Sequence, residues 1–170
     1  MNTDTPTSDS SRKLAPVYLV MSDELILDAP IERAWPKVID YPSWQKYSTV
    51  RHISGPVGQE GEVVLLKKEE PGATSFPPFL ARTLKFAPPH QIIWKTYPET
   101  GMEAGEFFGI VEFTLTSVGN RTRWRTQLIY EFTIPYEDER ELETFRKQQY
   151  ENTRLMLSST LPKLQRLCQE

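Results

Sequence analysis

The chain has 170 residues, of which 38% are hydrophobic and 11% aromatic, and this content suits one globular domain with a sizeable core. Its formal charge is -3 and its basic residues are scattered, which argues against a nucleic-acid partner or an anionic-membrane patch. No run of about twenty apolar residues exists to span a bilayer, and the N-terminus lacks the pattern of a signal peptide. We therefore expect a cytoplasmic protein without integral membrane association.

The first residues predict a tail followed by a strand. Residues 1–14 are rich in serine, threonine and aspartate, so we expect a disordered tail, with a single domain at residues 15–170. Residues 15–28 alternate as a strand does, with the odd positions facing inward. Asp23 is the one charged residue on that inward face.

Two short helices are expected next. Pro30 suits the first turn of a helix, and the apolar side of that helix would consist of Ile31, Ala34, Trp35, Val38 and Ile39. Pro36 is expected to interrupt the helix because it lacks a backbone N–H. A second helical turn follows, pinned by the rings of Tyr41, Trp44 and Tyr47.

Six more strands are predicted between turn signals, at residues 50–54, 62–69, 79–86, 91–97, 107–115 and 121–134. Glycines at 55, 58 and 61 mark one hairpin, and Gly119-Asn120 marks another. Pro135 is expected to stop the last strand. Whether the proline-rich loop at residues 71–78 acts as a lid is left open. In the strand at residues 79–86 the alternation places Arg82 on one face with Leu80, Leu84 and Phe86.

Residues 137–170 form the only segment long enough for a continuous amphipathic helix of about thirty residues. Its apolar stripe consists of Leu142, Phe145, Met156, Leu157, Leu161, Leu164 and Cys168. Gln149, Asn152 and Thr153 break the stripe, so this section either overhangs solvent or faces a cavity that holds water or a polar ligand. We expect a kink near Pro162. Cys168, the single cysteine, excludes an internal disulfide.

This order of elements resembles the helix-grip fold of the START and Bet v 1-like (SRPBCC) superfamily, including its polyketide cyclase/dehydrase and lipid-transport branch. The resemblance is carried by Ala29-Pro30-x-Glu32-x-x-Trp35, Asp40-Tyr41-x-x-Trp44, the turn from Gly55 to Gly61, and Pro88-Pro89-x-x-Ile92-x-Trp94. It implies an α+β fold in which a curved seven-stranded antiparallel sheet wraps around a long C-terminal helix, with two short helices after the first strand.

The resemblance also implies a mostly apolar cavity between the sheet and the long helix. Large inward side chains on the strands agree with it, and Gly109 among them would leave space for a ligand; the alternative is that these side chains fill a core. The predicted ligand-binding residues are Trp94, Phe107, Phe113, Trp124, Thr126, Leu128, Gln149, Asn152, Thr153 and Met156.

Four polar side chains are candidates for catalysis. Asp23 and Arg82 stand alone among hydrophobes, and they would pair across the cavity or Arg82 would bind a carboxylate or enolate oxygen. Alternatively, a β-bulge turns one or both into solvent. Tyr130 would bond a ligand carbonyl or a backbone group, and His52 would line the mouth of the cavity as a general base.

Three functions follow from these residues. The first is binding of a hydrophobic small molecule such as a lipid, polyketide or aromatic metabolite, by a monomer or homodimer. The second is a cofactor-free cyclase or dehydratase that acts on such a molecule. The third is a protein-interaction domain of the Hsp90-activator type, for which the pattern offers no clear exposed apolar patch. No metal ligands at suitable spacing and no nucleotide-binding motif are present, so neither a metal nor another cofactor is expected.

Overall fold

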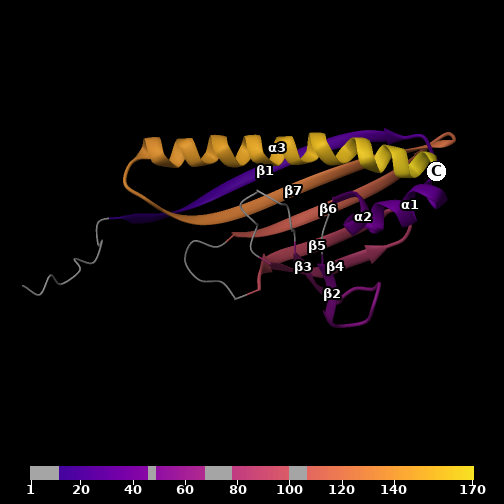
Figure 1. Cartoon of the computed structure of the whole chain (residues 1–170), viewed down its shortest axis with the longest axis horizontal. Helices are drawn as coiled ribbons and strands as arrows, with labels where there is room; N and C mark the ends of the chain where they lie inside the picture. Colours follow the sequence, from indigo (N-terminus) through magenta and orange to yellow (C-terminus); the bar gives the residue numbers. More distant parts are fainter. Residues whose placement is uncertain (1–11, 46–48, 68–77, 100–106) are drawn as a thin grey trace, which may run out of the picture.

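The computed structural model describes residues 12–45, 49–67, 78–99 and 107–170. Its elements, in chain order, are β1 (Lys13–Leu27), α1 (Ile31–Ile39), α2 (Tyr41–Gln45), β2 (Thr49–Ser54), β3 (Val63–Lys67), β4 (Phe79–Ala87), β5 (Gln91–Pro98), β6 (Phe107–Val118), β7 (Arg121–Tyr136) and α3 (Glu139–Gln169) (Figure 1). The strands form one antiparallel sheet in the order β1-β7-β6-β5-β4-β3-β2. The predicted fold class is confirmed.

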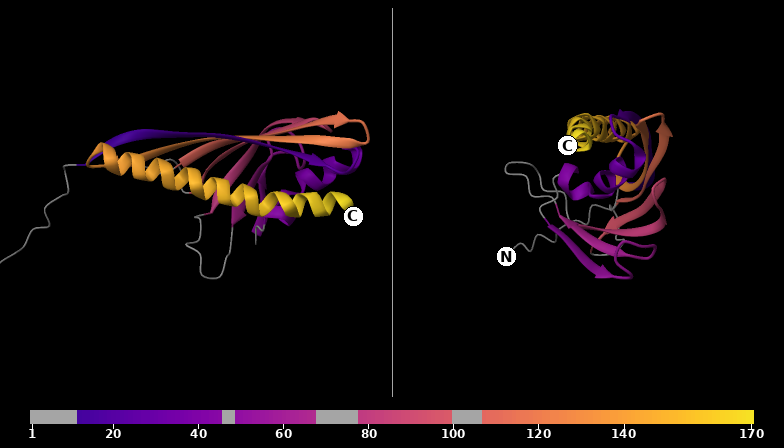
Figure 2. Two further views of the ribbon diagram at one scale, coloured as in Figure 1. Left: turned by 90° about the horizontal axis from the view of Figure 1, so that it is seen from above. Right: turned by 90° about the vertical axis from the view of Figure 1, so that its right-hand side faces the viewer.

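The sheet curls in an arc from β1, beside α3, to β2, and α1 and α2 lie inside the arc (Figure 2). The helix α3 packs against β1 and β7, and it also contacts α1 and α2. Because α3 lies on the concave side of the sheet, each strand has an inner face toward the helices and an outer face toward solvent. Which residues face inward therefore decides what the interior contains.

The strand β1 has the predicted inward set at its odd positions. Val17 and Leu27 are 2% and 0% exposed, whereas Tyr18 and Val20 are 63% and 59% exposed. The strand begins at Lys13, two residues before the predicted start of the domain, and residues 1–11 of the predicted tail lie outside the described residues. Asp23 falls on the inner side, as expected, and is partly buried.

The larger core cluster joins α1, α2 and the C-terminal part of α3 to the sheet. Its centre is a group of rings, in which Phe113 lies 5.1 Å from Trp94 and 5.3 Å from Trp124 between ring centroids. Trp44 lies against Phe113 and Trp124 and donates a hydrogen bond from Nε1 to the carbonyl of Val38 at 3.3 Å. The cluster buries Leu164 and Cys168 of α3 as well.

A smaller cluster lies at the other end of the molecule. Val17, Ile134 and Leu142 are its buried members, and Phe132 and Phe145 pack against them with ring centroids 5.4 Å apart. The two clusters hold α3 to the sheet near its two ends.

The helix α1 runs without interruption through Pro36, so the expected break there is wrong. Pro36 is exposed, while Ala34, Trp35 and Val38 are buried on the other side of the helix. Burial of these side chains outweighs the one backbone hydrogen bond that the proline ring removes. The second short helix is confirmed as α2, and Tyr47 of the predicted aromatic cluster lies outside the described residues.

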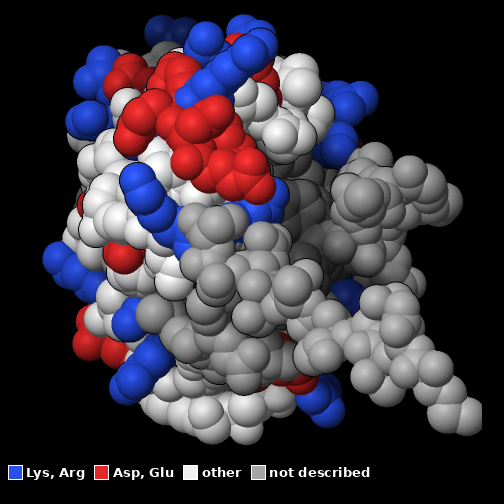
Figure 3. Space-filling view, turned by 90° about the vertical axis from the view of Figure 1, so that its left-hand side faces the viewer, with Lys and Arg blue, Asp and Glu red and all other residues white. Residues whose placement is uncertain are grey.

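The long helix α3 is continuous from Glu139 to Gln169 and includes Pro162, as the length of the amphipathic segment predicted. The Asp138 side chain accepts a hydrogen bond from the Glu141 backbone N–H at 2.9 Å, and the Glu141 carboxylate accepts one from the Glu137 N–H at 2.9 Å. Acidic side chains gather at this end of the molecule (Figure 3). This arrangement caps the helix and complements its dipole.

Replacement of the cap residue by Asp138→Ala is expected to lower the free energy of unfolding by about 1 kcal/mol. The physical reason is that the N–H of Glu141 loses its acceptor. Urea unfolding followed by circular dichroism measures the change. The matched control, Asp138→Asn, keeps a capping oxygen and should lose less than half as much; equal losses in both variants would contradict the capping role.

Candidate functional site

The interior between the two clusters is the candidate site, and we call it the central section. From the sheet it contains Thr96 of β5 and Thr126, Leu128 and Tyr130 of β7; from α3 it contains Thr153 and Leu157. All of these except Tyr130 are buried, and Tyr130 is partly buried. The central section is thus the part of the interior where hydroxyl groups lie among aliphatic side chains.

Two polar atoms in and beside this section are buried without a hydrogen-bond partner among the described residues. They are Trp124 Nε1 and Thr126 Oγ1, and both residues are 0% exposed. The other hydroxyls are satisfied: Thr96 donates to the Gly109 carbonyl at 3.3 Å, and Thr153 donates to the Gln149 carbonyl at 2.9 Å. Native interiors rarely leave such groups unpaired, because each costs about 1–3 kcal/mol.

Gly109 makes room for the ring of Tyr130. A Cβ atom at position 109 would lie 2.3 Å from Cδ1 and 2.6 Å from Cε1 of that ring. The space that we assigned to a ligand is therefore occupied by Tyr130 itself, which corrects this expectation. Burial raises the pKa of Tyr130 to about 12, so its phenol is protonated at neutral pH.

Arg82 lies on the outer face of β4 and is exposed, which agrees with the alternative in which a β-bulge turns it into solvent. Ala81 and Thr83 are the inward residues, at 2% and 6% exposure. A β-bulge between Thr83 and Lys85 then returns Phe86 to the inner side, where its ring lies 5.7 Å from that of Trp35. Regular alternation from Phe86 would place Arg82 on the inner face, and the one extra residue in the bulge moves Arg82 to the outer face.

The remaining candidates for catalysis lie on different strands. Asp23 stands opposite Thr126 in the register of β1 and β7, and its Oδ1 accepts a hydrogen bond from the Glu24 N–H at 2.8 Å. His52 is on β2, the strand at the other edge of the sheet, where its Nδ1 is 3.8 Å from a Glu62 oxygen. It is opposite Val64, which in turn is opposite the inward-facing Ala81, so it shares the concave side at the exposed edge.

The predicted ligand-binding residues do not all come together. Trp94, Phe113 and Trp124 pack in the larger core cluster. Asn152 is exposed on α3, which agrees with the alternative that this section overhangs solvent, while Gln149 and Met156 are partly buried. Phe107 begins β6, and its side chain lies outside the described part of the chain. The central section retains Thr126, Leu128 and Thr153 of the predicted set.

Comparison with family models found no match, and no curated protein matches the chain. Solved structures do match. An uncharacterized protein from Rhizobium leguminosarum is 14% identical with a TM-score of 0.65, covering 92% of this chain and 98% of its own. The di-domain ARO/CYC protein BexL of the BE-7585A biosynthetic pathway is 14% identical with a TM-score of 0.61, covering 90% of this chain and 50% of its own.

Norcoclaurine synthase from Thalictrum flavum, solved in complex with dopamine and hydroxybenzaldehyde, is 13% identical with a TM-score of 0.51 and covers 78% of each chain. These matches extend over 78–92% of this chain. The chain has the helix-grip fold. At these identities the likeness concerns the fold.

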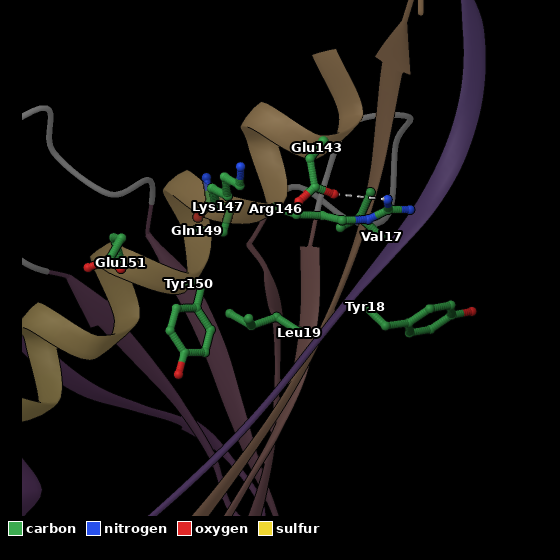
Figure 4. Close-up of a pocket in the computed structure, with 9 residues that line it drawn as sticks. All are labelled: Val17, Tyr18, Leu19, Glu143, Arg146, Lys147, Gln149, Tyr150 and Glu151. Carbon is green, nitrogen blue, oxygen red and sulfur yellow. Dashed lines mark ion pairs between the residues drawn. The ribbon is translucent and has the colours of Figure 1, made fainter. Parts of the chain in front are cut away.

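In this helix-grip domain a groove of about 280 Å³ opens between β1 and the first half of α3. Figure 4 shows Leu19 pointing from β1 toward Tyr150 of α3, whereas Tyr18 turns away from the helix. Arg146 crosses beside Val17 and pairs with Glu143 at 3.6 Å. Of the predicted ligand-binding residues, Gln149 lines this groove. The groove is therefore an opening at the edge of the sheet, separate from the predicted cavity, and the sequence did not predict it.

The outer face carries a small apolar patch at the same edge. Leu14, Tyr18 and Val20 of β1 and Ile129 of β7 are 38–63% exposed, and Val20 lies opposite Ile129. The even positions of β1 contained this signal, although we identified no clear patch. Charged residues occupy most other outward positions of β7, so we rank protein interaction third among the functions.

The described part of the chain also lacks two other kinds of feature. No three histidine, cysteine, aspartate or glutamate side chains gather there in a way that would hold a metal ion. None of its helices combines the length and hydropathy needed to cross a bilayer.

The variant Gly109→Ala is expected to lower the free energy of unfolding by about 1–3 kcal/mol, because the new methyl group collides with the Tyr130 ring. A double-mutant cycle with Tyr130→Leu checks the cause. In the Tyr130→Leu background, which lacks the ring, Gly109→Ala should lower the free energy of unfolding much less. An equal cost in both backgrounds would show that the ring is not what position 109 accommodates.

High pH should destabilise the protein partly through Tyr130. Its folded pKa of about 12 exceeds the ordinary value of about 10, so stability is intact below about pH 10 and is lost as the pH rises toward 12. In Tyr130→Phe, the fall in the free energy of unfolding between about pH 10 and pH 12 should be shallower by about 1 kcal/mol per pH unit. Chemical denaturation across this range measures it, and parallel curves would contradict burial of the phenol.

Proposed function

We propose that this protein binds a hydrophobic small molecule between the sheet and α3, at the central section. The observation that carries the proposal is the pair of buried polar atoms without a partner, Trp124 Nε1 and Thr126 Oγ1. A bound molecule with an apolar body and a polar group would pair them while keeping the surrounding apolar side chains out of water.

The position of these atoms supports the proposal. Thr126 lies at the margin of the larger core cluster, opposite Phe113 on one side and Asp23 on the other, where the inner face of β7 passes from Trp124 to Leu128. On α3, Thr153 lies on the buried face of the helix and already bonds to its own backbone, so it offers no competing partner. Norcoclaurine synthase, which shares the fold, is described with dopamine and hydroxybenzaldehyde bound.

Catalysis is the alternative, and we place it second. The ARO/CYC protein and norcoclaurine synthase share the fold, but an acid–base mechanism needs a positioned pair. Arg82 points outward, and Asp23 and His52 belong to strands at opposite edges of the sheet. Tyr130 remains as a proton donor, since its raised pKa makes it a poor base at neutral pH.

The variant Thr126→Val tests the proposal because it removes the hydroxyl and keeps the shape. We expect the ligand-free protein to keep or gain stability, by up to about 1 kcal/mol, since an unpaired buried hydroxyl disappears. Retention of a co-purified molecule in native mass spectrometry should fall about fivefold or more.

The matched control is Thr116→Val, at an exposed position on β6, which should change neither quantity. A Thr126→Val protein that is destabilised by more than 1 kcal/mol and retains the molecule fully would contradict the proposal, because the hydroxyl would then serve the fold and not the ligand. A wild-type protein that retains nothing and ignores a panel of lipids and aromatic polyketides would also contradict it.

A further inference from the structure

We infer that the ligand is a neutral molecule with a hydrogen-bond acceptor, such as a ketone or ester carbonyl, and that carboxylates are excluded. This inference rests on the proposed function and specifies its ligand. It follows from the charges on the inner face, from the position of Asp23 and from the chemistry of the two unpaired atoms.

The first step is the absence of an inward cation. On β3 to β7, within the described residues, every lysine and arginine lies on the outer face of the sheet. The register places them opposite one another or opposite other outward residues: Lys67, Arg82, Lys85, Lys95, Arg121, Arg123 and Arg125. A carboxylate taken into the central section would lose its hydration with no cation from β3 to β7 to replace it, which is costly.

The second step is the negative charge that does face inward. Asp23 is opposite Thr126, and side chains in directly opposed positions of an antiparallel pair lie on the same face with Cβ atoms about 5 Å apart. The hydrogen bond from the Glu24 N–H to Asp23 Oδ1 helps to hold this carboxylate in place. An anionic ligand group that reached Thr126 would therefore meet a like charge.

The third step concerns which ligand group can form hydrogen bonds with the two unpaired atoms. The indole N–H of Trp124 can only donate a hydrogen bond, whereas the hydroxyl of Thr126 can donate or accept one. Neither group carries a charge. The partner of Trp124 must therefore be an acceptor. Tyr130, four residues after Thr126 on the same face of β7, is a protonated phenol and adds no negative charge. A carbonyl oxygen meets all these conditions without bringing a charge into the site.

Three probes of nearly equal size test the inference: methyl naphthyl ketone, the naphthoate anion and ethylnaphthalene. Binding to the full-length protein at neutral pH is measured by isothermal titration calorimetry, with tryptophan fluorescence as a second readout. We expect the ketone to bind at least about tenfold more tightly than naphthoate and about fivefold more tightly than the hydrocarbon.

Two variants assign the preference to residues. Thr126→Val should reduce the preference for the ketone over the hydrocarbon to about twofold or less, and Thr116→Val should leave it unchanged. Asp23→Asn, which keeps an oxygen for the Glu24 N–H, should raise the affinity for naphthoate several-fold.

The outcomes separate this inference from the proposed function. Naphthoate binding as tightly as the ketone would overturn the inference and leave small-molecule binding intact. Equal binding of ketone and hydrocarbon would overturn the role of the two polar atoms. If none of the three probes binds and the broader panel of the preceding section also fails, the proposed function itself is overturned.

Discussion

Burial of one face of α3 on the concave side of the sheet is the interaction on which the rest of this structure depends. The helix is attached near both ends, through Leu142 and Phe145 at one and through Leu164 and Cys168 at the other. Because these apolar attachments lie far apart, the residues between them need not form a continuous apolar core. Hydroxyl groups occupy that interval, and the fold tolerates them because most are satisfied by backbone carbonyls.

The two unpaired atoms stand out against this background. Trp124 packs against the rings of Trp44 and Phe113, and its indole nitrogen has no acceptor among the described residues. Trp44, in the same cluster, has an acceptor in the Val38 carbonyl. A core that serves only stability would be more stable with phenylalanine at position 124 and valine at position 126, since neither would leave a polar atom unpaired. A ligand group that pairs both atoms would offset the cost of keeping them.

Most of the fold could be predicted from the sequence because its elements have strong local signals. The alternation in β7, the glycine turn before β3 and the amphipathic end each agree with the final topology. Local signals failed where tertiary packing decided the outcome. Burial of Trp35 keeps α1 intact through Pro36, and Gly109 accommodates a ring from the neighbouring strand and not a ligand. The groove beside Leu19 depends on how α3 meets the edge of the sheet, which no local pattern specifies.

The bulge in β4 had the largest effect on the candidate site. Its sequence signal was indirect: Arg82 can lie outside and Phe86 inside only if the strand contains one extra residue between them. A regular strand in register with Phe86 would turn Arg82 inward and supply the cation that a carboxylate ligand needs. With the bulge, Ala81 and Thr83 face the interior instead, and the guanidinium lies in solvent. If the interior binds a small molecule as we propose, this one additional residue in a single strand makes a neutral molecule a better fit than an anion.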